Sequence, residues 1–476
     1  MPQPRGWDGG GRFRMGAAGW AIGAAAGLLV AAHPASAQTL TEAFTYAYNN
    51  NPQLLAQRAS LRATDEGVPQ ALANWRPTVT FNANAGFNRA GFEQRNAAGQ
   101  PTPTQFSSFV SRSIDLQVAQ PIYRGGRTEA QTRQAINSVQ AARAATLAVE
   151  TTVFQAVATA YLDVVRDQTL VEVARNNEQV LRKQLDATRD RFRVGEVTRT
   201  DVAQAESSLA QATAQRITAE GNLETSRASY TRQVGHPPGR LVLPRERPAL
   251  PATREEALAI AAADNPAVIA ASFTELAARD NVDLVRGQLL PTISIVGDLN
   301  RTTAPSFTQQ NTRTDSASVV ARLTMPLYEA GSIYSQTRQA QQTVGQRRSQ
   351  VDDQRRSSVQ DATRAWETLQ AARAAIASFG AAVRAAQIAL EGTQQEALVG
   401  SRTVLDVLIA EQQLFTTQSQ LVTSQHDAAL QEFVLAAAMG RLIAPELKLP
   451  VKLYDMDRHY RSVKDKLLGF GGGLDE

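Results

Sequence analysis

The sequence lacks the groups that most metal sites, cofactor sites and disulfide frameworks use. It contains no cysteine, which excludes disulfides, thiolate metal ligands and an N-terminal cysteine that carries a lipid. The four histidines are scattered along the chain, so no metal site is expected. The motifs of serine hydrolases, zinc proteases and phosphate-binding loops are absent. The sequence therefore predicts neither an enzyme nor a protein that holds a cofactor.

Positive and negative charges are also nearly balanced, so neither sign is in large excess. The formal net charge is +4 in 476 residues, and the arginines occur singly along helical stretches instead of forming a stripe. This distribution is typical of a solvated helix surface, and it argues against nucleic acid as a partner.

Long apolar runs are confined to the N-terminus. Arginines within residues 5–14 precede the uncharged run 15–32, and an A-x-A sequence follows at 35–37. This order predicts a signal peptide over residues 1–37, with Gln38 as the first mature residue. A retained signal anchor is the alternative. Because no later apolar run approaches the ~20 residues of a membrane helix, we expect an exported protein without a transmembrane helix.

The sequence contains the same predicted turn between two helices at two places. Val194–Leu209 and Val399–Leu414 share Val-Gly, Asp-Val, Ala-Glu and Leu at one offset, 400 − 195 = 205. Each lies between two long stretches rich in Ala and Gln. Gly195 and Gly400 can each end a helix, because glycine takes φ > 0 without strain. Each stretch therefore predicts a tight turn between two antiparallel helices.

The second helix of each pair begins shortly after the glycine. Thr198 and Thr403 are each followed three residues later by an acid, Asp201 and Asp406. This spacing resembles a capping box, in which the threonine hydroxyl accepts a backbone N–H and the acid returns the bond. We expect both threonines to be N-caps.

Between the helical stretches the apolar period changes from 3.6 to 2. Over residues 78–88, Val, Phe and Ala at odd positions alternate with Thr, Asn and Gly at even ones. Alternation this strict over eleven residues indicates a strand with two different faces. The predicted strands are, approximately, 77–88, 109–121, 291–301 and 315–326.

The whole order of predicted helices and strands occurs twice, and this duplication sets the boundaries of two structural repeats. Pro52 and Pro77 recur as Pro266 and Pro291 at an offset of 214 (266 − 52). A helix of roughly 68 residues spans about 100 Å, twice the length of its returning partner. In each repeat a further helix begins at an Asn-Pro sequence. Stacked on the end of the returning helix, it can make up the difference in length from the long helix. We expect a first repeat over 38–240 with long helices 125–193 and 200–234, a linker over 241–252, a second repeat over 253–440 with long helices 331–399 and 403–439, and a partly disordered tail over 441–476.

Strands of about ten residues match the length that crosses a membrane. On this interpretation the apolar side chains face lipid and their polar neighbours face a lumen. Four strands cannot close a barrel, and open edges are not tolerated in lipid, so two, three or four chains would pool eight, twelve or sixteen strands. The expected lipid-facing residues are Val79, Phe81, Ile114, Leu116, Ile293, Ile295, Val319 and Leu323.

Two alternatives remain open from the pattern alone. The strands can form small soluble hairpins that cap a coiled coil. A periplasmic coiled-coil adaptor or structural stalk would also contain long helical hairpins. Such an adaptor needs a lipid or helix anchor, which this sequence lacks.

The duplicated order of helix, Asn-Pro, helix, Pro, strand pair, long helix, V-G-x₅-D-V turn and helix resembles the TolC family of outer-membrane efflux and secretion channels. The resemblance covers Thr39–Gly440. It implies a mainly α fold with a small β part, in which three chains share a twelve-stranded β-barrel and a twelve-helix periplasmic tunnel. It also implies a Gram-negative outer membrane location, a periplasmic adaptor (membrane fusion) protein and an inner-membrane pump as partners.

In that family the helical turns close the pore at its periplasmic end. Asp406 matches the first pore-lining Asp, whereas Ile409 stands where the family has a second one. Arg402 matches the turn arginine, and Thr200 and Asp201 match the partners that it bonds. The resemblance therefore implies a gate with one carboxylate ring above an apolar constriction. The plainer interpretation of both acids is a first-turn residue favoured by the helix dipole.

Overall fold

The structure is a computed structural model in which the described residues are 38–93, 97–101, 103–244, 246–306 and 309–469. The predicted signal peptide, residues 1–37, lies outside the described residues. Within the unit that the described residues form, helices predominate and the strands make one small sheet, which confirms the predicted fold class.

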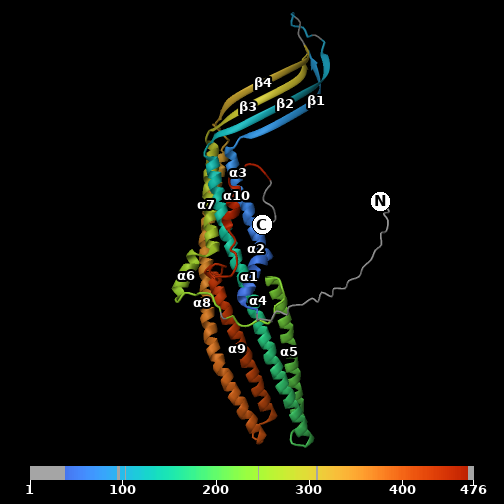
Figure 1. Cartoon of the computed structure of the whole chain (residues 1–476), viewed down its shortest axis with the longest axis vertical. Coiled ribbons are helices and arrows are strands. Elements are labelled where there is room, and N and C mark those ends of the chain that lie inside the picture. Colours follow the sequence, from blue (N-terminus) through green and yellow to red (C-terminus); the bar gives the residue numbers. More distant parts are fainter. Residues whose placement is uncertain (1–37, 94–96, 102, 245, 307–308, 470–476) are drawn as a thin grey trace, which may run out of the picture. The chain divides into compact units, whose positions relative to one another are not determined.

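Two long helical hairpins form the scaffold (Figure 1). The first pairs α4, Arg127–Arg193, with α5, Arg199–Val234; the second pairs α8, Ser332–Leu398, with α9, Val404–Ala438. α4 and α8 contain 67 residues each, which corresponds to about 100 Å of helix. Both hairpin turns lie at the lower end in Figure 1, and the strands lie at the other end.

Each short returning helix is continued by a second helix, as the sequence predicts. Asn51 is the N-cap of α2, and its amide donates to the carbonyl of Gln233 near the end of α5, at 3.0 Å. Asn265 plays the same part for α7 and Ala438 of α9, at 2.8 Å. The bounds of these elements are α1 Leu40–Asn50, α2 Pro52–Asp65, α3 Gly67–Leu72, η1 Ala73–Trp75, α6 Arg254–Ala263, α7 Pro266–Arg286 and η2 Gly287–Leu289.

The strands form one antiparallel sheet in the order β1-β2-β3-β4. At the end of the sheet away from the helices all four strands run beyond the predicted ends, because main-chain pairing continues from Asn88 to Phe92 although the apolar alternation has stopped, whereas β4 stops at Thr324, two residues before its predicted end. The bounds are β1 Thr78–Phe92, β2 Gln105–Arg124, β3 Thr292–Ser306 and β4 Gln309–Thr324.

The largest core lies halfway along the helices, where α1 packs against α4, α5 and α9. Phe154 of α4 is fully buried, with its ring centroid 5.0 Å from that of Phe44. Tyr161 of α4 is also buried, and its hydroxyl donates to the carbonyls of Gln38 and Val242 at 2.8 Å. The linker between the repeats is therefore fastened to the first long helix.

The expectation of a partly disordered tail is wrong for most of its length. Leu442, Ala444 and Leu449 are buried in the same core. The chain then forms α10, Met456–Val463, and Arg76 donates to the carbonyl of Lys466 at 2.9 Å. Residues 470–476 of the predicted tail lie outside the described residues.

One stretch of the described chain, Arg254–Leu289, contains an 18-residue window with a mean hydropathy of 1.3, which by length and composition is enough to cross a membrane. Charged residues and Pro266 lie within it, so the stretch is not an uninterrupted apolar run of that length. The stretch is interrupted at Asp264 between α6 and α7, and α7 packs between α4 and α8. The stretch is rich in alanines, which permit close helix packing, and we assign it to the helix bundle.

Candidate functional site

The two faces of the sheet differ in chemistry. Residues paired across antiparallel strands point to the same side. One such row consists of Val79, Val118, Gly297 and Val319, in strand order. The next row along the strands consists of Thr80, Gln117, Asp298 and Ser318, and it points to the opposite side. The register therefore gathers most of the apolar side chains of the four strands on one face and most of the polar ones on the other.

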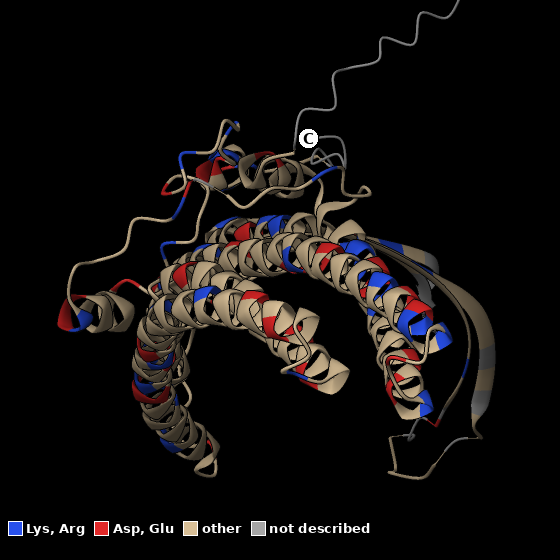
Figure 2. Cartoon of the chain, turned by 90° about the horizontal axis from the view of Figure 1, so that it is seen from below, with Lys and Arg blue, Asp and Glu red and all other residues tan. Residues whose placement is uncertain are grey.

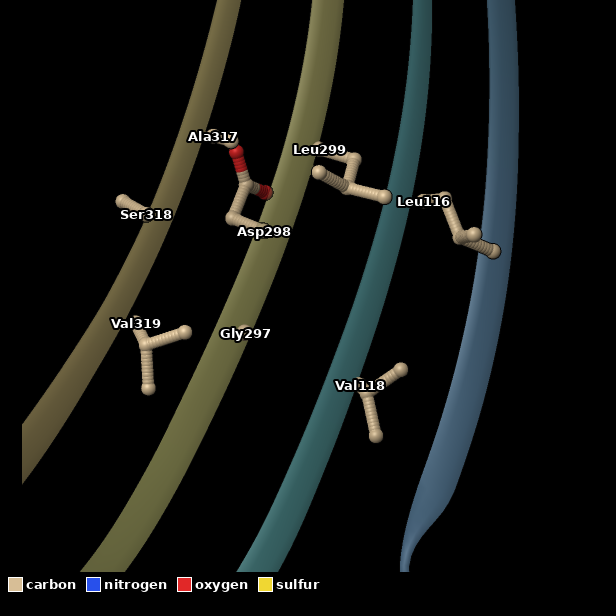
Figure 3. A pocket seen from close by; sticks show the side chains of 8 residues that line it. All are labelled: Leu116, Val118, Gly297, Asp298, Leu299, Ala317, Ser318 and Val319. Atoms are coloured by element: carbon tan, nitrogen blue, oxygen red, sulfur yellow. The ribbon is translucent and has the colours of Figure 1, made fainter.

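The eight residues expected to face lipid all lie on the apolar face. All of them are exposed in the single chain, from 36% for Leu116 to 80% for Val319. A shallow hollow lies over Gly297, which leaves no side chain between Val118 and Val319 (Figure 3). Around Gly297 the apolar face extends over β2, β3 and β4, and among the described residues no protein layer packs against it.

The two hairpin turns have the same backbone geometry. Gly195 and Gly400 each have φ = +80°, a conformation that favours glycine. After them the chain turns back, with the N–H of Glu196 donating to the carbonyl of Arg191 at 2.9 Å, and Ser401 to Glu396 at 3.0 Å. Both bonds span five residues, as in a Schellman motif.

Both predicted capping boxes are confirmed. The hydroxyl of Thr403 accepts the N–H of Asp406 at 3.2 Å, and the Asp406 carboxylate accepts the N–H of Thr403 at 2.9 Å. Thr198 and Asp201 repeat the arrangement at 3.2 and 2.8 Å. The backbone N–H and hydroxyl of Thr403, with the charge of Arg402, hold the pKa of Asp406 below its ordinary value. Asp406 therefore stays ionised at lower pH than a free aspartate.

One ion pair closes each turn. Arg191 contacts Glu196 at 2.6 Å in the first turn, and Arg402 contacts Glu396 at 2.8 Å in the second. The structure thus places Arg402 on a residue of its own turn, whereas Asp201 is bonded to Thr198. Among the contacts of the described chain, Arg402 is not brought to Thr200 or Asp201, so that pairing stays a prediction.

The start of α9 packs against both α4 and α8, and Val407 lies in a buried cluster with Leu390 and Ala397 of α8. Val404 and Leu408 pack against Leu181 and Leu185 of α4. Ile409 is 58% exposed, and Asp406, three residues before it, is partly exposed. Since residues three apart lie on one side of a helix, the acid and the isoleucine share a free surface one turn from the tip.

Sequence reasoning missed a set of buried ionisable groups halfway along the helices. Glu432 of α9 is 3% exposed, and its carboxylate accepts from Arg247 of the linker and Arg373 of α8, both at 2.9 Å. Glu150 of α4 is 4% exposed and accepts the N–H of Ala444 at 2.6 Å. Burial raises the pKa of Glu150. These carboxylates fasten the linker and the tail to the long helices.

Charge on the helices is mixed in sign. Seen from the hairpin turns, the helices lie along an arc, and acidic and basic residues are interspersed on them (Figure 2). Among the described residues, no group of three or more His, Asp or Glu side chains is placed to hold a metal ion. The features that remain to be explained are an uncovered apolar sheet face and a pair of matching helical turns.

Comparison with known proteins accounts for both. The sequence profile described as Outer membrane efflux protein matches residues 45–236 and 257–441, one range in each repeat. The outer membrane efflux protein BepC of Brucella suis biovar 1 (strain 1330) is 34% identical over 444 residues, 93% of this chain and 94% of BepC. The outer membrane protein TolC of Vibrio cholerae is 28% identical over 416 residues, 85% of this chain and 91% of TolC.

A solved structure has the same fold. The CmeC outer membrane channel of Campylobacter jejuni superposes with a TM-score of 0.74, covering 90% of this chain and 89% of that one. The two sequences are 14% identical, so the likeness concerns the fold. It extends over both the helical hairpins and the sheet.

Proposed function

Because this chain belongs to the outer membrane efflux protein family, the family of TolC, we propose that it works as a homotrimeric channel. Membership makes it an outer membrane efflux channel that extends into the periplasm, and it removes the adaptor or stalk alternative. The trimer, the gate and the lipid contacts are the further steps that we propose.

The observation that carries the trimer is the unpaired sheet. β1 and β4 each have one edge without a partner strand in the described chain. In lipid, each unpaired N–H and C=O would cost several kcal/mol, so these edges must be joined. Three chains, with β4 of one beside β1 of the next, give the twelve strands that the family resemblance implies. The exposed apolar face then meets lipid, and the polar face lines the lumen.

We place the gate at the hairpin turns. The helices continue from the sheet for about 100 Å, which puts the turns deep in the periplasm. Asp406 and Ile409 lie on the uncovered side of α9, so three copies supply three carboxylates and three apolar side chains around one axis. Like charges held close in a narrow opening attract cations and repel anions. Contacts from Arg402 to Thr200 and Asp201, made between chains, would restrain this gate.

The proposed partners follow from the role of an outer membrane efflux channel. We propose a periplasmic adaptor protein and an inner-membrane pump, since an outer membrane channel has no energy source of its own. The hairpin ends offer exposed apolar side chains for such a contact, with Val194 78% and Val399 80% exposed. These two valines are equivalent by the offset of 205, so both turns present the same residue.

The test is conductance of the purified protein in planar bilayers under a salt gradient. We expect single channels that prefer cations, with the preference reduced in Asp406→Ala and kept in Asp201→Ala. The second variant is the matched control, because both substitutions remove a capping-box acid. Protein that inserts into the bilayer but never conducts would overturn the proposal that it forms a channel. Unchanged reversal potentials in Asp406→Ala would instead show that Asp406 only begins a helix.

A further inference from the structure

The apolar face of the sheet carries a cluster of charges at one level. Arg112 of β2, Arg301 of β3, and Arg313 and Asp315 of β4 lie on that face, because they share the register of its apolar residues. We call these four residues the outer charge cluster. The next paired rows toward the helices, which contain Leu299 and Val319, are apolar.

The cluster is organised around its single acid. The carboxylate of Asp315 accepts from Arg301 Nε at 2.6 Å and from Arg313 Nε at 2.9 Å. Arg112 lies in the neighbouring strand, diagonal to Arg301, and is exposed. Three guanidinium groups and one carboxylate leave a net charge of +2. The two paired arginines remain 55% and 56% exposed, so part of each fork faces outward.

Neither the sheet nor the repeat requires these charges. On the opposite face, the row between the two charged rows is uncharged, with Asn84, Ser113, Thr302 and Thr314, and the next row toward the helices carries one acid, Asp115. In the first repeat the equivalents of Arg301, Arg313 and Asp315 are Phe87, Ser108 and Val110, from 301 − 214, 313 − 205 and 315 − 205. Three of the four residues, Arg301, Arg313 and Asp315, therefore belong to the second hairpin without charged equivalents in the first, and Arg112 joins them from β2 of the first hairpin.

The level of the cluster fits the edge of the hydrocarbon layer. From Thr292, where β3 begins, to Arg301 is nine residues, or about 30 Å along the strand. A strand tilted by about 40° rises about 23 Å over that length, close to the ~25 Å apolar band of an outer membrane barrel. The helices occupy the periplasmic side, so this edge belongs to the outer leaflet.

We propose that the outer charge cluster binds the phosphate groups of an anionic lipid headgroup in the outer leaflet. This proposal rests on the proposed function, which puts the apolar face in lipid. Arginine forks match phosphate oxygens in bidentate pairs. Asp315 holds two of the forks in place before the lipid arrives, and Arg112 adds a third donor group from the next strand. In a trimer, three such sites alternate around the barrel with the apolar patches of the first hairpin.

The test measures lipid retained by full-length protein reconstituted in phosphatidylcholine nanodiscs. One set contains bisphosphorylated lipid A, and a second contains lipid A from which the phosphates have been removed. The variant replaces Arg112, Arg301 and Arg313 by Gln and Asp315 by Asn, which takes the net charge from +2 to zero. At about a factor of five per charge, retention of the phosphorylated lipid should fall about 25-fold. Arg322→Gln is the matched control, since Arg322 lies in β4 on the opposite face.

A second variant, Arg301→Lys with Arg313→Lys, keeps the positive charges but loses the bidentate guanidinium groups. Its retention of phosphorylated lipid should lie between that of the unmodified protein and that of the Gln/Asn variant. Equal retention of both lipids by the unmodified protein, or no loss in the Gln/Asn variant, would overturn the proposal. Inorganic phosphate that displaces the lipid would assign the site to a free anion instead. Channel conductance is recorded for every variant. Conducting variants with unchanged lipid retention refute this proposal alone, whereas loss of insertion in Arg322→Gln would count against the barrel itself.

Discussion

An arginine at Val319 tests whether the apolar face of the sheet meets lipid. Val319 is 80% exposed and lies in the same cross-strand row as Gly297. Gly297 is five residues from the start of β3, which is about 17 Å along the strand and about 13 Å of rise at a 40° tilt. This is half of the ~25 Å apolar band, so Val319→Arg should cost ~2–4 kcal/mol, the midplane value.

Two further arginines give the expected profile. Ser318→Arg changes the adjacent residue on the polar face, where water solvates the charge, and should cost within about 0.5 kcal/mol. Leu323→Arg lies on the apolar face beside Ile293 at the helix end of the sheet, and should cost about 0–1 kcal/mol. The free energy of unfolding, from urea titrations of protein folded in lipid vesicles, measures all three. Equal costs for Val319→Arg and Ser318→Arg would refute the assignment of faces.

Three other outcomes follow from the described chain. Gly440→Ala should cost ~2 kcal/mol or more of unfolding free energy, since its φ is +73° and a Cβ would come within 2.4 Å of Pro266; Gly221→Ala, in an open part of α5, should instead stabilise by about 0.5–1 kcal/mol. Glu150→Gln should raise the melting temperature at neutral pH and leave it unchanged in acid, because a raised pKa means that stability is fully present below the ordinary 4.5 and is lost as pH rises through the folded value. N-terminal sequencing of outer membrane fractions should begin at Gln38, and a sequence beginning at Met1 would contradict signal cleavage.

The hairpin turns could be predicted because their chemistry is local. A glycine with φ > 0 and a threonine three residues before an acid act within one turn of helix, so three positions are enough to specify each turn. The faces of the strands were equally accessible, because a period of two needs only one strand to be seen. The ends of the strands were not, since the pairing of Phe92 with Gln105 depends on main-chain groups that are the same in every residue.

The contact of Arg402 illustrates the opposite case. Family resemblance pointed to Thr200 and Asp201, which lie in the other hairpin. Within the chain, Glu396 is six residues away in sequence and forms the ion pair at 2.8 Å. A local partner costs little conformational entropy, so it is the default in one chain. The gate contact can form only where a second chain brings Asp201 close enough to compete with Glu396.

The buried carboxylate of Glu150 is a signal in the sequence that another segment packs on α4. Glu150, Val157, Val164 and Val171 follow one another at intervals of seven, and all four are buried on α4. The valines predicted helix packing along that stripe, and the glutamate interrupts it. A carboxylate in a buried position needs a donor, since burying it unpaired is costly. The donor is the N–H of Ala444, which belongs to the tail and not to a helix. An acid at a buried position of a heptad stripe therefore indicates that another segment is folded onto the helix there, and in this chain that segment is the tail that follows Gly440.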